Sequence, residues 1–226
     1  MEDDGRWRRA DAQTLNASPS SQALIRRIGT AAWWGLLLFV AMAVLVQWRR
    51  RDLDWIDAPL SFYLLGAGGH WLQAAYFVLA ATLGLLGWGC FLALPAAKRS
   101  TAPWLLFACA GIGLVVTALA HSNLPGHPPT FEGWLHGLAA QSTFLCVTVA
   151  TLLQSWRLRA APHGRSRFAA AFALALAGFA GIWIDALWHG MPRGLEQRIV
   201  IALILAWLLL TAAWLRHASV TPTQPD

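Results

Sequence analysis

The stretch HSNLPGHPPTFEGWLH, from His121 to His136, lies between two long apolar runs and decides how the rest of the chain is interpreted. It contains three histidines, one glutamate and one asparagine, and no lysine or arginine. Prolines interrupt helices, so the stretch is predicted to be a polar loop that joins two helices. If those helices cross a membrane, the side on which this loop lies fixes the place of the other polar residues.

The composition is typical of a membrane protein. Of the 226 residues, 57% are hydrophobic and 12% are charged, whereas about 25% are charged in an average globular domain. A helix needs roughly 20 apolar residues to cross about 30 Å of hydrocarbon. Runs of this kind are predicted to span the membrane at 28–48, 70–94, 103–120, 134–155, 168–188 and 199–215. We therefore predict an all-α integral membrane protein, a six-helix bundle at 28–216 between polar tails at 1–27 and 217–226.

Lysine and arginine are unequally divided between the two sides that these spans define. Twelve of the 17 lie in the two tails and in the loops after the second and fourth spans, and five lie on the other side. Cytoplasmic loops are enriched in these residues, so both termini are predicted to be cytoplasmic. Because arginine greatly outnumbers lysine, as in GC-rich bacterial genes, we expect a multi-pass protein of the bacterial inner membrane.

Tryptophans mark the predicted membrane interfaces. Indole rings prefer the level of the headgroups. The predicted belt on the outer side consists of Trp48, Trp71, Trp134 and Trp188. The predicted belt on the inner side consists of Trp104, Trp156 and Trp214.

The sequence also narrows the classes of partner. The arginines flank apolar runs and form no stripe on a soluble face, so the expected partner is the lipid bilayer and not nucleic acid. No P-loop or Rossmann fingerprint occurs. Cys90, Cys109 and Cys146 lie inside apolar runs without CxxC spacing and are interpreted as packing residues. Ala177 and Gly181 form a small-xxx-small pair, which allows helices to approach closely.

Histidines and acids gather on the predicted outer side. They are His70, His121, His127, His136, His189, Asp52, Asp54, Asp57, Glu132, Asp185 and Glu196. One interpretation is that these residues only keep the outer loops solvated, because arginine is disfavoured on this side of the membrane. The other is a polar crevice at the mouths of the spans, because polar groups there are costly without partners or water.

Asp185 and His189 are spaced i, i+4 at the outer end of the fifth span, so they share one helical face. This spacing suits a helix-end hydrogen bond, or a carboxylate that orients a metal-binding imidazole. With His121 and His136 at neighbouring span ends, His189 completes a set suited to zinc or another divalent ion. His136, His189 and Asp185 are then the catalytic candidates. Haem ligation by two histidines is a further alternative.

Arg198 begins the sixth span on the side that is poor in arginine. It is predicted to pair with Glu196 or Asp185, or to hold a phosphate or carboxylate group in a bidentate fork. Glu196, Arg198, His70 and Asn123 are therefore candidate ligand-binding residues.

Three motifs carry a resemblance to a known family. They are Pro59-Leu60-Ser61 before a glycine-rich turn, Gly133-Trp134-Leu135-His136-Gly137, and Gly194-Leu195-Glu196-Gln197-Arg198. In this order, over about residues 30–215, they resemble the six-span prokaryotic family catalogued as domain of unknown function number 998. The resemblance implies the six-helix fold and adds Ser61 to the candidate ligand-binding residues, but it implies no activity. Where members carry an aspartate, this chain has Asn123.

Three functions follow from these residues. The first is a membrane protein that binds or moves a lipid or small molecule through an outer polar crevice. The second is a metal-dependent intramembrane hydrolase, in which a metal held by His and Asp activates water against a lipid ester or amide. The third is a structural partner in an envelope complex.

Overall fold

The computed structural model describes residues 19–123, 126–159, 165–188 and 190–217, and within these ranges the chain is helical without strands. Six long helices follow one another, and two of the connections between them contain a 3-10 turn. The helices are α2 (Pro19–Arg49), α3 (Gly69–Ala93), α4 (Thr101–Leu119), α5 (Phe131–Leu158), α6 (Arg165–Leu187) and α7 (Arg193–Arg216), and the 3-10 turns are η1 (Leu60–Leu64) and η2 (Ala96–Lys98).

All six helices are long and apolar enough to cross a membrane. Even α4, with 19 residues, reaches about 28 Å at the helical rise of 1.5 Å per residue. The predicted fold class, an all-α bundle of six membrane helices, is confirmed.

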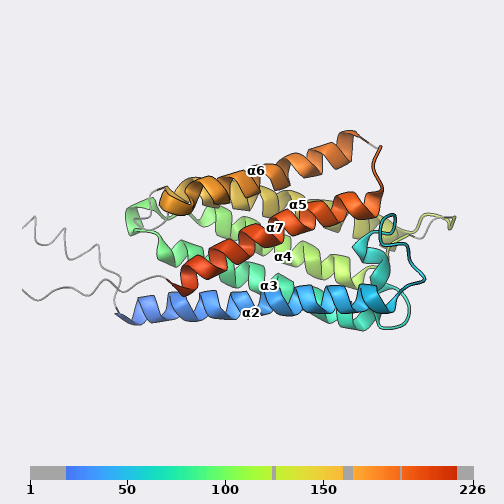
Figure 1. The fold of residues 1–226 in the computed structure, drawn as a ribbon, viewed down its shortest axis with the longest axis horizontal. Coiled ribbons are helices and arrows are strands. Elements are labelled where there is room, and N and C mark those ends of the chain that lie inside the picture. The colour runs from blue at the N-terminus through green and yellow to red at the C-terminus, as the bar shows by residue number, and fades with distance from the viewer. Residues whose placement is uncertain (1–18, 124–125, 160–164, 189, 218–226) are drawn as a thin grey trace, which may run out of the picture.

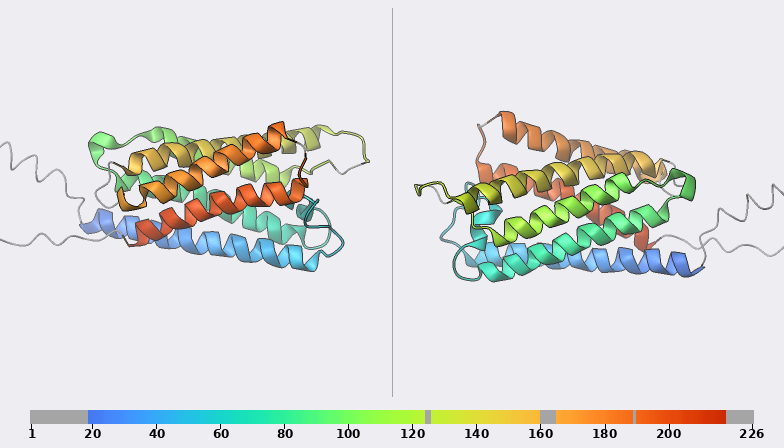
Figure 2. Two further views of the ribbon diagram at one scale, coloured as in Figure 1. Left: turned by 45° about the horizontal axis from the view of Figure 1, so that its top comes forward. Right: turned by 180° about the vertical axis from the view of Figure 1, so that it is seen from behind.

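The helices form a closed ring in which each packs against the next in sequence and α7 packs against α2 (Figures 1 and 2). We call the end of the bundle that holds Pro19 and Arg216 the terminal end. The opposite end, which holds η1 and the connections before α5 and α7, is called the loop end (Figure 1). The first and last of the described helices, α2 and α7, are therefore neighbours.

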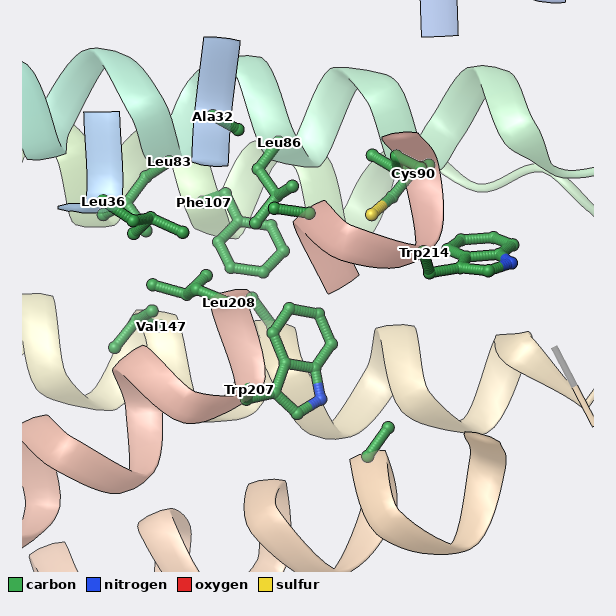
Figure 3. Close-up of a cluster of buried hydrophobic side chains, with 14 of the residues drawn as sticks. Ala32, Leu36, Leu83, Leu86, Cys90, Phe107, Val147, Trp207, Leu208 and Trp214 are labelled. Carbon is green, nitrogen blue, oxygen red and sulfur yellow. The ribbon is translucent and has the colours of Figure 1, made fainter. Parts of the chain in front are cut away.

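The main core lies in the middle of the bundle and toward the terminal end (Figure 3). The ring of Trp207 on α7 lies 5.9 Å from the ring of Phe107 on α4, and both side chains are fully buried. The indole Nε1 of Trp207 donates to Ser155 Oγ at 2.7 Å, so its polar atom is satisfied inside the core. A second core cluster, built around Phe39, Tyr63 and Leu72, lies toward the loop end.

Several helices extend beyond the predicted spans. Helix α2 begins at Pro19, inside the predicted tail, because Ile25 is already buried against the core. Helix α7 begins at Arg193, six residues before the predicted span at 199, because its first turn packs on the connection between α2 and α3. Helix α5 begins at Phe131, and its N-cap Thr130 accepts the N–H of Gly133 at 3.0 Å.

One predicted tryptophan belt agrees with the structure and the other agrees only in part. All four tryptophans assigned to the outer belt are exposed near the loop end. At the terminal end Trp156 is exposed, but Trp214 is buried in the core (Figure 3). The prediction was wrong for Trp214, because its side chain points inward from α7.

The small residues of α6 also differ from the prediction. Gly178 and Gly181 are the ones that face α7, where Gly181 lies against Val200, and Ala177 is exposed. Beyond Gly178 none of the described side chains of α6 is buried, and this part of the helix diverges from the bundle (Figure 1). The three cysteines are free thiols, and only Cys90 is fully buried.

Candidate functional site

The connection between α2 and α3 folds over the loop end and binds the first turn of α7. The backbone N–H of Leu195 donates to the carbonyl of Ile56 at 2.8 Å. The side chain of Gln197 accepts the N–H of Leu60 at 2.7 Å. Two of the sequence motifs, which lie far apart in the chain, are thus directly joined.

Gly194 makes this contact possible. A Cβ at this position would lie 2.6 Å from the carbonyl oxygen of Ile56 and 2.7 Å from that of Ala58. Real Cβ atoms do not approach backbone oxygens so closely, so only glycine allows the connection to rest on α7.

Arg198 joins three parts of the loop end. Its Nε donates to the side-chain oxygen of Gln47 on α2 at 2.8 Å. Its Nη1 donates to the carbonyls of Ala58 at 2.9 Å and Gly194 at 2.8 Å. These acceptors are neutral groups, so the observed role of the guanidinium is to hold the connection to α2 and α7.

Tyr63 of η1 completes this polar cluster. Its ring is fully buried, and the ring centroid lies 5.8 Å from Arg198 Cζ. Burial raises the pKa of the Tyr63 phenol, an effect that the nearby Arg198 and Arg50 partly oppose. The phenol therefore stays protonated at neutral pH and can act as a hydrogen-bond donor.

Arg50 fixes the other end of the connection. Its Nε donates to Asp52 Oδ1 at 2.8 Å, and its Nη1 donates to the carbonyl of Leu65. The glycine-rich turn that follows is confirmed, with φ of 80° at Gly66 and 84° at Gly68.

A cavity of about 90 Å³ lies beneath η1. Its walls come from η1 and from α2, α3, α4, α5 and α7, and they are mostly aliphatic and aromatic side chains. Ser61, which the family resemblance singled out, lines it next to Gln197.

The polar groups in the cavity wall are largely satisfied within the protein. Thr117 Oγ1 donates to the carbonyl of Gly113 at 2.8 Å, and Thr143 Oγ1 donates to that of Ala139 at 2.8 Å. Gln197 Oε1 is engaged with Leu60. The interior surface is therefore effectively apolar, in contrast to the polar crevice that the sequence predicted.

The proline-rich loop has its own polar contacts. His121 Nδ1 lies 2.7 Å from Glu132 Oε1, and both side chains are exposed. Asn123 Oδ1 accepts the N–H of Thr130 at 3.1 Å and its hydroxyl at 2.9 Å. Asn123 thus closes the loop onto the start of α5.

His136 is 5% exposed, and its Nδ1 donates to the carbonyl of Ala120 at 2.9 Å. That carbonyl lies at the end of α4, where helix carbonyls have no intrahelical partner. His136 therefore ties the end of α4 to α5.

The remaining candidates are dispersed over the loop end. His70 is exposed at the start of α3, with its ring 5.1 Å from that of Trp71. Glu196 is buried in the first turn of α7. His189 and the side chain of Asp185 lie outside the described residues, as do residues 1–18 and 218–226 of the predicted tails.

The part of the chain that the structure describes contains no group of three or more histidine, cysteine or acidic residues placed to hold a metal ion. His121 and His136 have different partners, Glu132 and Ala120. The metal site and the catalytic residues His136, His189 and Asp185 stay a prediction, because two of the three are not described.

Sequence reasoning missed Gln47, Tyr63 and Tyr76. Gln47 binds Arg198, Tyr63 lies against it, and Tyr76 lines the cavity. A usable signal existed for Gln47, since a glutamine within an apolar run needs a polar partner inside the bundle.

No curated protein and no solved structure matches the chain. A sequence profile described as "Protein of unknown function (DUF998)" matches residues 34–214. This match spans most of the chain and includes all three motifs, which lie at the loop end. The protein therefore belongs to the DUF998 family of proteins of unknown function.

Proposed function

We propose that this multi-pass membrane protein binds or moves a lipid or another small apolar molecule through the cavity at the loop end. The observation that carries the proposal is the apolar cavity beneath η1, which is lined by side chains from five helices. Ligand pockets are commonly hydrophobic hollows with a few polar groups that orient the ligand.

The size of the cavity limits its ligand. At about 90 Å³ it is smaller than the roughly 150 Å³ apolar cavity that accepts a benzene ring. It suits the end of an acyl chain or a small apolar molecule. A whole phospholipid is too large for this volume.

The segment that covers the cavity is held by hydrogen bonds and by the second core cluster, in which Ala58, Leu60 and Tyr63 are buried. Gln197 and Arg198 hold Leu60 and Ala58, and Ser61 faces the cavity from the same segment. This arrangement makes η1 the element whose release would open the cavity. Arg198 then acts as a positioning residue and Ser61 as a contact for the ligand.

We further propose a bacterial inner-membrane location with both termini in the cytoplasm. The support is the excess of lysine and arginine at the end of the bundle where α2 begins and α7 ends. The cavity then lies in the outer half of the membrane, within reach of outer-leaflet acyl chains.

Photolabelling with a diazirine-bearing fatty acid, mapped by mass spectrometry, tests the proposal. We expect adducts on cavity-lining peptides, and loss of these adducts in Ala140→Phe, which places a ring in the cavity. The matched control is Ala202→Phe, because Ala202 is exposed on α7. Undiminished labelling of these peptides in Ala140→Phe would contradict the proposal.

A further inference from the structure

The cavity beneath η1 differs in polarity between its two ends. Its wall follows α7 from Gln197 to Leu208, a rise of roughly 16 Å along the helix. Gln197 and Ser61 lie at the loop end, where Gln197 binds Leu60. Val147 and Leu208 lie at the other end of the wall and belong to the main core in the middle of the bundle. The cavity therefore has a polar end beneath η1 and an apolar end deeper in the bundle.

Two hydrogen-bond donors at the polar end are unused. Gln197 accepts the N–H of Leu60 with its side-chain oxygen, which leaves the two N–H groups of its Nε2 atom. Neither Nε2 of Gln197 nor the hydroxyl of Ser61 makes a hydrogen bond with any residue that the structure describes. Because Ser61 directly follows Leu60, both donors lie at the same end of the cavity.

These two donors are open to a ligand, unlike other unbonded polar atoms nearby. Tyr63 Oη and Arg198 Nη2 also lack a partner within the described part of the chain, but packing seals them completely. Ser61 Oγ and Gln197 Nε2 are not sealed in this way, and both residues line the cavity. A ligand oxygen can therefore be bound by Ser61 and Gln197 but not by Arg198.

The charge of the wall limits the ligand further. No charged side chain is present among the described residues that line the cavity. A carboxylate or phosphate would be buried there without a cation, which is costly. An ester carbonyl is neutral and only accepts hydrogen bonds, so it suits a pair of free donors.

We infer that the ligand of this cavity is an acyl ester. Its carbonyl oxygen accepts hydrogen bonds from Ser61 Oγ and Gln197 Nε2, and its chain lies toward Val147 and Leu208. This inference rests on the function proposed for the cavity and adds the chemical class of the ligand. Ser61 and Gln197 select the polar group, and the aliphatic part of the wall takes the chain.

The test uses three probes of equal chain length that carry the same diazirine, namely a methyl ester, the free fatty acid and the alkane. Each is applied at pH 8 to the full-length protein in phosphatidylcholine nanodiscs, and labelling of cavity-lining peptides is measured by mass spectrometry as a function of probe concentration. In Ser61→Ala, loss of one hydrogen bond should weaken binding of the ester by about three- to tenfold. The alkane should change by less than about twofold. Comparing each probe between variants cancels its partition into lipid.

Gln197→Glu tests the second donor. The substitution keeps an oxygen that can accept the N–H of Leu60 but replaces the Nε2 donor by an acceptor. We expect the ester to lose at least as much affinity as in Ser61→Ala. If Gln197→Glu fails to fold, Ser61→Ala decides alone.

Two other hydroxyls in the cavity wall provide controls. Thr117→Val removes a hydroxyl that already donates to the carbonyl of Gly113 at 2.8 Å, so binding of the ester should change by less than about twofold. Equal losses in Thr117→Val and Ser61→Ala would overturn the inference. Tyr76→Phe removes a hydroxyl that makes no hydrogen bond with described residues. A loss of ester binding in Tyr76→Phe but not in Ser61→Ala would place the carbonyl elsewhere and overturn the assignment.

The outcomes separate this inference from the function on which it rests. If all probes label the cavity saturably and Ser61→Ala affects the ester and the alkane equally, the inference is overturned and the proposed function stands. Tighter binding of the free acid than of the ester has the same meaning, because the cavity would then prefer a carboxylate. If no probe labels the cavity of the wild type saturably, both the inference and the proposed function are overturned.

Discussion

The side chain of Gln197 accepts the backbone N–H of Leu60 at 2.7 Å, across 137 positions of sequence. This bond attaches the first connection of the chain to its last helix. Because both residues also line the cavity, the stability of the loop end and the shape of the cavity depend on the same contacts.

Replacing Arg198 by methionine should destabilise the protein. The change removes three hydrogen bonds and leaves the oxygens of Gln47, Ala58 and Gly194 without this donor. We expect the free energy of unfolding to fall by about 2–4 kcal/mol. Arg198→Lys should recover only part of this loss, since an ammonium cannot reproduce the guanidinium geometry. Thermal unfolding in detergent measures the effect, with exposed Arg193→Met as the control.

Gly194→Ala should be one of the most damaging small substitutions. Its Cβ would overlap the carbonyl oxygens of Ile56 and Ala58, so the connection must lift away from α7. The control is Gly137→Ala, where a Cβ meets nothing within 4 Å, and where alanine favours the helix by up to about 1 kcal/mol. The melting temperature should fall in the first variant and stay level or rise in the second. Similar values for both would show that the close contact is unimportant.

His136→Phe should weaken the join between α4 and α5. The substitution keeps a ring of similar bulk but removes the donor to the carbonyl of Ala120. A loss of about 1–3 kcal/mol in the free energy of unfolding is expected. Exposed His70→Phe should change it by less than about 0.5 kcal/mol. An equal effect at both positions would contradict the structural role of His136.

The same two variants test the predicted metal site. Elemental analysis of untagged protein should find about one zinc per chain if the metal-dependent hydrolase prediction is correct, lost in His136→Phe and retained in His70→Phe. Wild-type protein without stoichiometric metal would remove that prediction.

Acid should loosen the connection at Asp52. Hydrogen bonds from Arg50 hold the pKa of Asp52 below its ordinary value, which is about 3.9. The hydrogen bonds from Arg50 therefore stabilise the folded protein fully at pH values above the ordinary pKa of aspartate. This stabilisation is lost as the pH falls through the lower pKa that Asp52 has in the folded protein. Asp52→Asn should show a shallower fall in melting temperature between about pH 5 and pH 2 than the wild type. Asp57→Asn changes an exposed residue in the same segment and serves as the control. Identical curves of melting temperature against pH for Asp52→Asn and the wild type would refute the prediction.

The fold was predictable because membrane spans depend on local properties, namely the length and polarity of a run of residues. The residues at which the helices begin and end were less predictable. The first turn of α7 contains polar residues that precede the apolar run, yet it is helical because Leu195 binds the connection between α2 and α3. This packing depends on a tertiary contact that hydropathy does not report.

For the candidate site, the sequence identified some of the residues but not the contacts that they make. Arg198 and Ser61 were singled out, but the partners of Arg198 depend on which helices are neighbours in the ring. Sequence spacing can relate Arg198 to Glu196 on its own helix. The apolar surroundings of Gln47 indicate that it needs a polar partner, but they do not identify Arg198, which lies 151 positions away. The polar outer residues were therefore expected to face a ligand, whereas many of those described bind the backbone.

The pairing of α2 with α7 bears on how the protein is made. The first helix leaves the ribosome long before the helix that completes its packing, so its inward face must wait for the last stretch of the chain. The cover of the cavity waits for the same stretch, since Gly194 to Arg198 hold it in place. A product truncated before α7 would keep five spans but present an unclosed seam, which gives membrane proteases a direct means of recognising an unfinished copy.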